Sequence, residues 1–567
     1  MPKESPSAYD VADPPSGRPD IRRPSMVPRN RTADRFSHSR QWLVAILALT
    51  LGWSSAQIGI AATAGPEKTS TTAERIFESG EVRELGLVEA IQLALEHNLG
   101  LQVQRVSQGK AFLDPIIAEA AFDPLFSTGF TLSESETTST SIIDGAAVGE
   151  TSKRSNDSYF MGLSGLMRYG TSWQFRLNGN RSESSVVSPF FSPLNYRSGV
   201  ELTLSQPLLR GRGRDITETN LRVALRNAEA SKLATVRGME TTVAAVESSY
   251  WDLVYARRNV EVQRSALQEA EELLELNRRR LEVEVGTRLD VISAEANVAT
   301  QRASIISALN LLRDLQDVLL DTINAPEFRG GKNVASLLKD LEVVPTTAID
   351  PTQFDPDLES VVQEALVRRL ELAQSSLQID SSEDLLKVRE NDLLPTLDLT
   401  GSFSQPGNGL EFGDSWSDVG DDYAWSAGLN LQIPFGQRAA QNREMQARED
   451  LRLAQLSKEQ ISNGIILEVT RAVRELDSAR QSVETTQAAT RLRREELDGE
   501  TRRLEAGVST AYQVLQVQNS LLAAQVQDLQ AQIRVRKAIT GYRNATGTIL
   551  KDYGIRLDEL LQPGPLK

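Results

Sequence analysis

The sequence contains no cysteine and only two histidines, His38 and His97. The lack of cysteine excludes disulfide bonds, thiolate metal sites and a lipid attached to an N-terminal cysteine. The scarcity of histidine removes the side chain that most often performs acid–base chemistry at neutral pH. A formal net charge of −15 argues against nucleic acid as a partner, because phosphates require a basic surface. We therefore predict no enzyme, cofactor or metal site, and we expect His97 to be a surface or packing residue.

The longest apolar run of the chain lies near its start, at residues 42–53, and follows several arginines. As a helix these residues would rise about 18 Å, which is less than the roughly 30 Å hydrocarbon core of a bilayer. Residues 62–64 provide the small-x-small pattern that a signal peptidase requires. We predict a secretory leader over residues 1–64 that starts at Met1 or Met26. A membrane anchor and an organelle transit peptide are the alternatives.

No later segment contains eighteen consecutive apolar residues, so we expect any membrane-crossing part of the mature chain to consist of strands. Apolar and polar residues alternate, as in strands with one apolar face, at 126–132, 173–177, 200–204 and 425–431. Long solvated loops are predicted between them, at about 134–157, 182–197 and 405–423, and a tight turn is predicted at 168–171. This pattern is typical of transmembrane β-barrel strands, and a soluble β-subdomain with one buried face is the alternative.

The C-terminal two-thirds of the chain contains one helical pattern twice. Adding 223 to a residue number carries one apolar seam onto another, so that Val246 maps onto Val469 and Leu253 onto Leu476. Adding 271 relates earlier parts in the same way. The first seam continues for about 65 residues without proline, which corresponds to roughly 100 Å of helix. Such long helices are expected to pack against one another as a bundle, and we predict two tandem copies of one unit.

Several short motifs occur in a fixed order along these copies. They are Leu87-Val88-Glu89-Ala90-Ile91, Gln206-Pro207-Leu208-Leu209-Arg210-Gly211, and Val285-Gly286-Thr287-Arg288 followed by Asp290-Val291-Ile292. In these motifs, and in the doubled order of short helix, strands, long helix, turn and return helix over about 85–550, the chain resembles the TolC family of outer-membrane channel proteins.

The resemblance implies an α+β membrane protein, in which a trimeric outer-membrane β-barrel is continued by a periplasmic α-helical barrel. Physics also requires an oligomer, because a few strands cannot close a barrel and open edges are not tolerated in lipid. The expected divisions are a leader at 1–64, a polar lead-in at 65–84, repeat 1 at 85–330, a linker at 331–355, repeat 2 at 356–550 and a tail at 551–567. Within repeat 1 we expect strands at about 125–207 and helices at about 217–283 and 290–324, and within repeat 2 a helix at about 357–392, strands at about 396–433 and helices at about 438–505 and 510–548.

By resemblance, the turns between the long helices form the periplasmic gate. Carried over residue by residue, Arg288 matches the turn arginine of the family, Asp290 is its nearest acidic neighbour, and Tyr512 lies in the second turn. The alternative is that Arg288 and Asp290 only cap helix ends. The resemblance also implies that an adaptor protein docks on the turns at Val285, Gly286, Thr287, Gly507, Val508 and Ser509, whose glycines could equally serve only to reverse the chain.

One departure from the family concerns the number of strands. The family usually supplies four strands per protomer, but the segment before Pro207 contains an additional alternating pair at about 158–167 and 171–181. We expect either six strands per protomer and a wider barrel, or a hairpin that stands outside the membrane.

The predicted function is that of an exit duct in the outer-membrane part of a tripartite efflux pump or type I secretion system. The implied partners are two further copies of the chain, a periplasmic adaptor (membrane fusion) protein, an inner-membrane transporter and outer-membrane lipid. A secreted coiled-coil scaffold with a β-head is the alternative, and a periplasmic hydrolase with a helical stalk is a third reading that the lack of histidine and cysteine disfavours.

Overall fold

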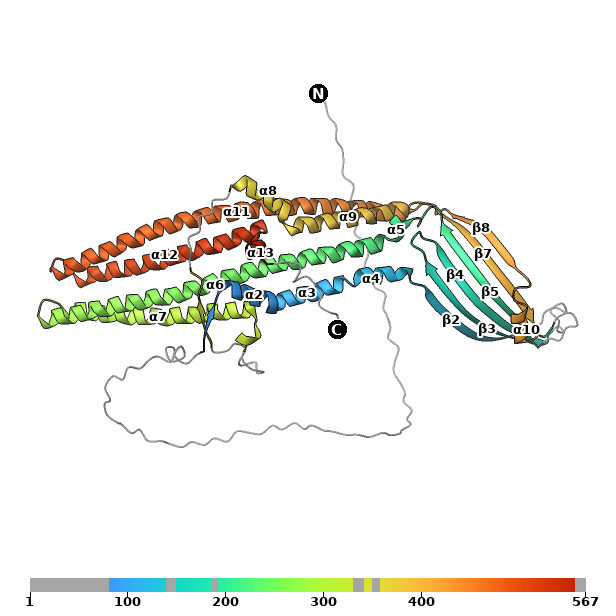
Figure 1. Cartoon of the computed structure of the whole chain (residues 1–567), viewed down its shortest axis with the longest axis horizontal. Coiled ribbons are helices and arrows are strands. Elements are labelled where there is room, and N and C mark those ends of the chain that lie inside the picture. The colour runs from blue at the N-terminus through green and yellow to red at the C-terminus, as the bar shows by residue number, and fades with distance from the viewer. Residues whose placement is uncertain (1–80, 139–148, 186–191, 330–340, 349–356, 556–567) are drawn as a thin grey trace, which may run out of the picture. The chain divides into compact units, whose positions relative to one another are not determined.

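Four long helices dominate the structure, a computed structural model that describes residues 81–138, 149–185, 192–329, 341–348 and 357–555. They are α6 (Thr219–Glu282), α7 (Arg288–Ile323), α11 (Arg438–Glu505) and α12 (Ala511–Thr546). α6 packs against α7 and α11 packs against α12, and α12 also packs against α6 (Figure 1). The predicted leader at 1–64 lies outside the described residues. In the part of the chain that is described, no helix combines the length and the apolar character needed to cross a bilayer.

Most bounds of the long helices coincide under the offset of 223, although α11 begins four residues before the position that corresponds to the start of α6. Glu282 at the end of α6 maps onto Glu505 at the end of α11, and α7 and α12 coincide at both ends. Both return helices end in a left-handed residue, Asn324 (φ 58°) and Gly547 (φ 68°), the residue types that accept this conformation most readily. The two hairpins therefore share one backbone design despite different side chains.

The main hydrophobic core lies where the short helices meet α6 and α7. Tyr250, Trp251 and Leu253 of α6 are buried there together with Leu319 and Leu320 of α7. The short helices in contact with it are α2 (Leu87–His97) and α3 (Leu99–Ala111); the corresponding pair in the second half is α8 (Leu358–Arg368) and α9 (Leu370–Asn391). Further short helices are α4 (Asp114–Glu119), α5 (Arg214–Thr217) and α13 (Ile549–Asp552), with 3-10 turns at Ala120–Phe122 and Pro326–Phe328.

The expectation of one continuous helix over 357–392 is wrong, because Arg369 interrupts it in an extended conformation. Adding 271 maps Asn98, which interrupts the first short helix, onto Arg369. The side chains at both breaks donate to a backbone carbonyl near the end of a return helix: Asn98 Nδ2 to Thr322 O at 2.7 Å, and Arg369 NH1 to Ala545 O at 2.9 Å. These tertiary hydrogen bonds hold the two breaks in place. They join residues far apart in the chain, so the local spacing of apolar residues does not predict them.

Two segments expected to be polar connections each supply a strand. β1 (Glu81–Leu85) pairs in parallel with β6 (Leu341–Pro345), within the predicted lead-in and linker. Leu85, Leu341 and Val343 are buried in the main core, and Tyr250 Oη donates to the carbonyl of Leu85 at 3.0 Å. Strands this short carry too few apolar residues to show a period, which explains why the sequence did not predict them.

A six-stranded antiparallel sheet lies beyond one end of the long helices (Figure 1). Its order is β2 (Leu125–Thr138), β3 (Thr151–Leu166), β4 (Ser172–Ser184), β5 (Leu194–Pro207), β7 (Thr396–Gly409) and β8 (Ala424–Gln432). The additional hairpin, β3 and β4, thus lies inside the same sheet as the other strands. The predicted tight turn at 168–171 is confirmed by hydrogen bonds between Met167 and both Gly170 and Thr171.

The loops between the strands are shorter than expected. Pairing continues to Thr138 in β2 and resumes at Thr151 in β3, although both residues fall in a stretch expected to be a solvated loop. Polar Ser and Thr side chains in these extensions accept strand geometry because the backbone pairs, and their polarity alone suggested a loop. The expected loop at 405–423 also contains the end of β7 and a helical turn, α10 (Phe412–Ser417).

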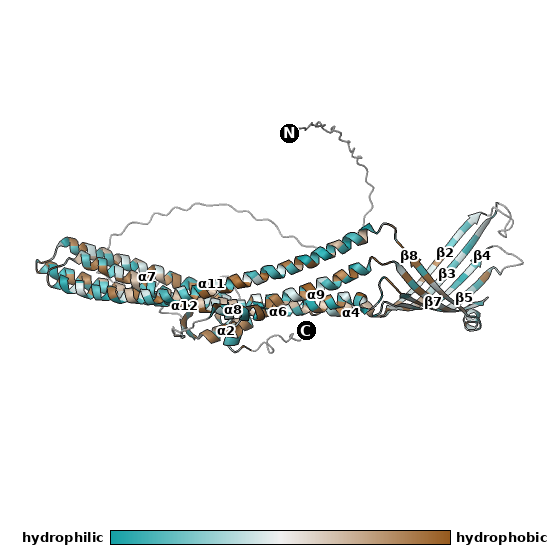
Figure 2. Ribbon diagram, turned by 90° about the horizontal axis from the view of Figure 1, so that it is seen from above, coloured by the Kyte–Doolittle hydropathy of each residue, from teal (hydrophilic) through white to brown (hydrophobic). Residues whose placement is uncertain are grey.

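The two faces of this sheet differ in character. One cross-strand row is apolar over all six strands and consists of Phe126, Leu163, Phe175, Leu202, Phe403 and Trp425. The side chains of this row are between 37% and 70% exposed, so the chain itself does not cover them. The neighbouring row on the opposite face is polar or small and consists of Ser127, Gly162, Arg176, Glu201, Ser404 and Ala424. In Figure 2 the strands accordingly alternate between hydrophobic and hydrophilic colours along their length.

Candidate functional site

The first hairpin tip connects α6 to α7 through residues 283–287. Val285 and Gly286 donate their backbone N–H groups to the carbonyl of Arg280, both at 2.9 Å, which closes the last turn of α6. The left-handed residue of this tip is Glu284 (φ 60°), not Gly286. Gly286 is small for another reason, because a Cβ there would lie 3.1 Å from the Cβ of Arg280. The glycine therefore permits close packing against α6 and does not itself supply the left-handed conformation.

The second tip, between α11 and α12, repeats this geometry with other residues. Gly507 (φ 77°) occupies the left-handed position, and Val508 donates to the carbonyl of Arg503 at 2.9 Å. Under the offset of 223, Glu284 corresponds to Gly507 and Val285 to Val508. One backbone conformation is thus built with glycine in one copy and with glutamate in the other.

Both return helices begin with a capping box. Thr287 and Asp290 exchange hydrogen bonds in the first tip, with the Thr287 backbone N–H donating to the Asp290 carboxylate at 3.0 Å. Thr510 and Gln513 do the same in the second tip. Asp290 therefore caps the start of α7, which is the role that the sequence analysis gave as the alternative to the gate. Arg288, beside it in the sequence, is exposed.

Tyr512 projects from the first turn of α12. Its side chain is 60% exposed, and its hydroxyl accepts a hydrogen bond from Gln516 Nε2 at 2.9 Å. Ser509, just before this helix, donates to Glu500 of α11 and to Gln513. The second tip is thus held by short-range polar contacts, and Tyr512 is left as its protruding side chain.

The two tips also contact each other, through residues that the sequence analysis did not select. Arg280 of the first hairpin donates from NH1 to the carbonyl oxygen of Leu504 in the second, at 2.6 Å. A small apolar cluster of Leu273, Leu504 and Val514 is buried beside this hydrogen bond. The run Arg-Arg-Leu-Glu occurs at 279–282 and again at 502–505, and it contains Arg280 in the first copy and Leu504 in the second. The sequence shows this repeat, but only the packing of the hairpins shows that the two tips are linked.

The ends of both tips expose apolar side chains. Val285 and Leu289 are 66% and 71% exposed in the first tip, and Val508 is 67% exposed in the second. Isolated exposed apolar residues are common on protein surfaces, but here they gather on two adjacent turns. The tips therefore offer an apolar surface that this chain does not cover.

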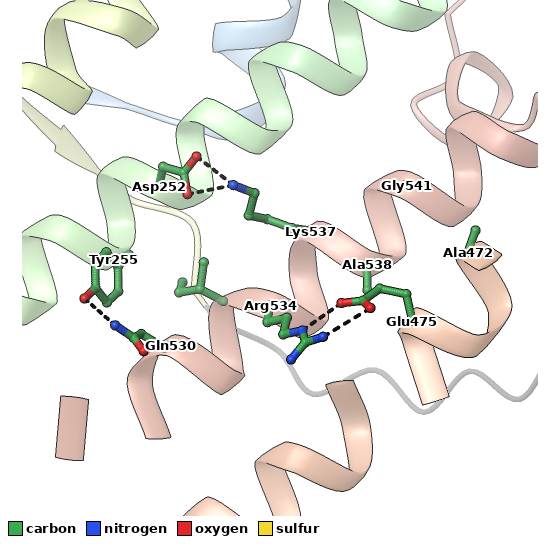
Figure 3. Close-up of a pocket in the computed structure, with 10 residues that line it drawn as sticks. Asp252, Tyr255, Ala472, Glu475, Gln530, Arg534, Lys537, Ala538 and Gly541 are labelled. Atoms are coloured by element: carbon green, nitrogen blue, oxygen red, sulfur yellow. Dashed lines mark hydrogen bonds and ion pairs between the residues drawn. The ribbon is translucent and has the colours of Figure 1, made fainter. Parts of the chain in front are cut away.

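A groove of about 480 Å³ lies farther from the tips, between α6, α11 and α12. Figure 3 shows its charged side chains paired across the helices: Asp252 with Lys537 at 2.8 Å and Glu475 with Arg534 at 2.7 Å. Tyr255 accepts from Gln530 at 3.0 Å. These contacts fasten α12 to both long helices, and the groove does not present a converging set of catalytic groups.

Two acidic groups, the half-buried Glu371 and the buried Glu247, lie near the junction of the short and long helices. Glu371 receives hydrogen bonds from Arg369, which is only 5% exposed, and although burial opposes this effect, these bonds hold the pKa of Glu371 below its ordinary value. Glu247 is 3% exposed, and among the residues that the structure describes its ion pair is a long one, 3.9 Å, to Arg543. Burial therefore raises the pKa of Glu247. The ion pair of Arg369 and Glu371 therefore stabilises the fold, whereas ionisation of Glu247 destabilises it.

The geometry defines a class of protein: long paired helices, joined by hairpin tips, that continue into a sheet with one exposed apolar face. The model of the outer membrane efflux protein family matches residues 173–319 and 361–548, which is more than half of the chain. The chain belongs to this family, and its place is the outer membrane. Its curated relatives bear the names of outer membrane efflux and export proteins.

Among curated proteins, the chain is 28% identical over 316 residues to outer membrane efflux protein BepC of Brucella suis, a stretch that spans 55% of this chain and 64% of that protein. It is 24% identical over 334 residues to pyoverdine export outer membrane protein OpmQ of Pseudomonas aeruginosa, over 58% of this chain and 65% of that protein. The matched stretches thus cover less than two thirds of these relatives. Among solved structures, the CmeC outer membrane channel of Campylobacter jejuni superposes with a TM-score of 0.60 at 16% identity, over 91% of this chain and 98% of that chain.

Proposed function

We propose that this chain is the exit duct of a tripartite efflux pump or a type I secretion system, and that three copies form one channel. In this channel the sheets of the three copies close a β-barrel in the outer membrane, with six strands from each chain. The helices continue the bore through the periplasm, and each chain contributes two tandem repeats. The channel conducts passively, and an energised inner-membrane transporter drives the flow.

The observation that carries this proposal is the sheet. Its apolar row extends from β2 to β8 without interruption, while the opposite face carries Arg176 and Glu201. Lipid outside and water inside a barrel require this division. The edge strands β2 and β8 have no further strand beside them in the described part of the chain, and an unpaired edge is costly in a bilayer. Pairing of β8 with β2 of another copy would satisfy both edges.

The helices offer a second reason for assembly. On α3 and α4, Val103, Val106, Ile116 and Ile117 are between 65% and 74% exposed. On the first half of α11, Met445, Leu453 and Leu456 are between 54% and 63% exposed. Neighbouring copies in a ring would bury both faces, which stabilises an oligomer by about 25 cal/mol for each Å² of apolar surface removed from water.

The tips support the proposed gate and docking site. Their exposed apolar residues suit contact with a hairpin of a periplasmic adaptor, at Val285, Gly286 and Thr287 in one tip and at Gly507, Val508 and Ser509 in the other. Arg288, Asp290 and Tyr512 lie at the narrow end of the proposed tunnel. Because Asp290 is engaged in its capping box, Arg288 and Tyr512 are the residues better placed to meet a neighbouring copy.

The test is electrophysiology on the purified protein in planar bilayers. We expect trimers that resist dissociation in detergent and that open discrete, water-filled channels. A monomer that is soluble without detergent and shows no conductance would contradict the proposal and favour the scaffold. A structure of the assembled protein with four membrane strands per chain would contradict the six-stranded barrel.

The role of Arg288 is tested separately. We expect Arg288→Ala to raise both single-channel conductance and the entry of vancomycin into cells, because it removes a charge from the constriction. Arg502→Ala is the control, since Arg502 is also exposed near a tip but lies on α11, before the turn. Unchanged conductance and vancomycin entry for Arg288→Ala would remove Arg288 from the gate.

A further inference from the structure

The short helix α10 lies on the apolar face of the sheet, at the end remote from the long helices (Figure 1). It packs over one cross-strand row formed by Tyr159, Gly179, Ser198 and Gly407. Phe403 and Gly407 lie four residues apart on β7, so this row faces the same side as the apolar row through Phe403. The helix therefore covers the surface that faces lipid in the proposed barrel.

The row beneath α10 is shaped to hold it. Ser415 of α10 is completely buried, and its hydroxyl lies 2.8 Å from that of Ser198, which is 5% exposed. A Cβ on Gly407 would collide with the carbonyl oxygen of Ser415. Trp416 Nε1 donates to the hydroxyl of Tyr159 at 3.2 Å. Gly407 and Ser198 on two neighbouring strands thus leave room for the helix, Gly179 leaves room for the ring of Tyr159, and polar contacts hold the helix there.

α10 also lies where β8 is too short to pair with the end of β7. β8 pairs with β7 only as far as Ala424 opposite Ser404, whereas β7 continues to Gly409. In the described part of the chain, the extra residues of β7 therefore have no strand on their outer side. The backbone N–H of Asn408 is satisfied instead by the carboxylate of Asp418, just after α10, at 2.9 Å. This arrangement protects an edge that lipid would not tolerate.

The height of α10 on the sheet matches the edge of a bilayer. Ten residues of β7 separate Leu397, near the helices, from Gly407 beneath α10, and they span about 34 Å along the strand. A tilt of roughly 40° reduces this span to about 26 Å along the membrane normal, close to the 25 Å apolar band of outer-membrane barrels. Beyond α10 the same face turns polar, with Asp157 and Arg181 paired at 3.0 Å.

We propose that α10 is an interfacial strap, which covers the upper edge of β7 and contacts lipid at the boundary between headgroups and acyl chains in the outer leaflet. The strap is suited to this boundary because Phe412, which is 53% exposed, is apolar, while Trp416 and Tyr159 join an apolar ring to a polar tip. This assignment rests on the proposed barrel, which decides that the face is turned to lipid.

The strap can be tested by spin labelling, because the chain has no cysteine and each introduced cysteine is a single site. The label is placed on Gly413→Cys, since a Cβ there meets nothing within 4 Å. Phe403→Cys serves as the mid-membrane reference and Asp421→Cys as the exposed loop reference. Collision of each label with oxygen and with a water-soluble nickel chelate gives its depth in phosphatidylcholine vesicles.

We expect the label at 413 to lie at a depth between those of 403 and 421. Gly407→Ala should shift it to the accessibility of 421 by displacing the strap, whereas Gly401→Ala, on the same face of β7 with nothing within 4 Å of its Cβ, should leave it unchanged. A label at 413 that already matches 421, or that matches 403, overturns the strap while the barrel stands. A label at 403 that is no more accessible to oxygen than the one at 421 overturns the barrel itself.

Discussion

Removal of the Arg280 guanidinium is the most direct test of the link between the two tips. Arg280→Ala deletes the hydrogen bond from NH1 to the carbonyl of Leu504, the polar contact that joins the first hairpin to the second at this level. A hydrogen bond from a charged donor contributes about 1.5–3 kcal/mol, and more is lost when the acceptor is left without a partner. If the tips separate when the channel opens, the ratio of open to closed tips should rise by a factor of about 10 to 150.

The second repeat provides the matched control. Adding 223 maps Arg280 onto Arg503, which pairs within its own helix with Glu500 at 3.2 Å and whose side chain is 62% exposed. An exposed pair of this kind contributes about 0.5 kcal/mol or less. Single-channel recordings should therefore show longer or larger openings for Arg280→Ala than for Arg503→Ala, at similar thermal stability of the trimers.

Two outcomes would refute this reasoning. Equal open probability for Arg280→Ala and the unmodified channel would mean that the hydrogen bond does not restrain opening. Equal effects of Arg280→Ala and Arg503→Ala would mean that charge near the tips, and not the link between hairpins, controls the channel. Leu504→Ala measures the contribution of the apolar cluster separately from that of the hydrogen bond. It removes the buried side chain of the cluster but keeps the backbone carbonyl that accepts from Arg280.

Three further predictions concern stability. Arg369→Ala removes one of the two arginines that pair with Glu371, leaving Arg237, and also the hydrogen bond to the carbonyl of Ala545; it should cost about 1–3 kcal/mol, measured as a lower midpoint of thermal unfolding, and an unchanged midpoint would contradict a stabilising role of Arg369. Glu247→Gln should raise the unfolding midpoint at pH 8, because the pKa of Glu247 is raised in the fold and its ionisation is destabilising; the difference should vanish as the pH falls below the ordinary glutamate pKa, and a difference that grows with acidity would refute it. Glu284→Gly should be neutral or stabilising, whereas Gly507→Glu should cost about 1–2 kcal/mol in the same assay, because both positions require a left-handed backbone; equal effects of the two changes would contradict this.

The sequence predicted the long helices closely because their apolar residues recur with a helical period over many turns. The predicted end near 283 compares with Glu282 in α6, and the predicted end at 505 coincides with that of α11. A strong period fixes the faces of a helix, and the turn residues fix where it stops. The alternating pairs in β3 and β4 were found in the same way, although their polar extensions were mistaken for loops.

Features set by contacts between distant segments could not be predicted. The break at Arg369 depends on the carbonyl of Ala545, which is 176 residues away in the chain. The contact between Arg280 and Leu504 spans 224 residues, and α10 is held by a hydroxyl of β5 across 217 residues. None of these partners lies within a window over which sequence periodicity operates, so each looked like an ordinary surface arginine or a loop serine.

Comparison of the two tips separates what the fold requires from what the channel can vary. Both tips use a left-handed residue, a hydrogen bond back to an arginine carbonyl and a capping box, so these features are constraints of the hairpin. The residues that differ between the copies at the start of the return helices, Arg288 and Leu289 in one and Ala511 and Tyr512 in the other, take no part in that framework. In a ring of three chains the two kinds of tip would alternate, so a tip with a charged residue and a tip with an aromatic residue would meet at every contact. The hairpin backbone can therefore stay the same while these positions set the chemistry of the proposed constriction. Leu289 and Tyr512 are both exposed, so exchange of these two residues between the tips should alter conductance without altering stability.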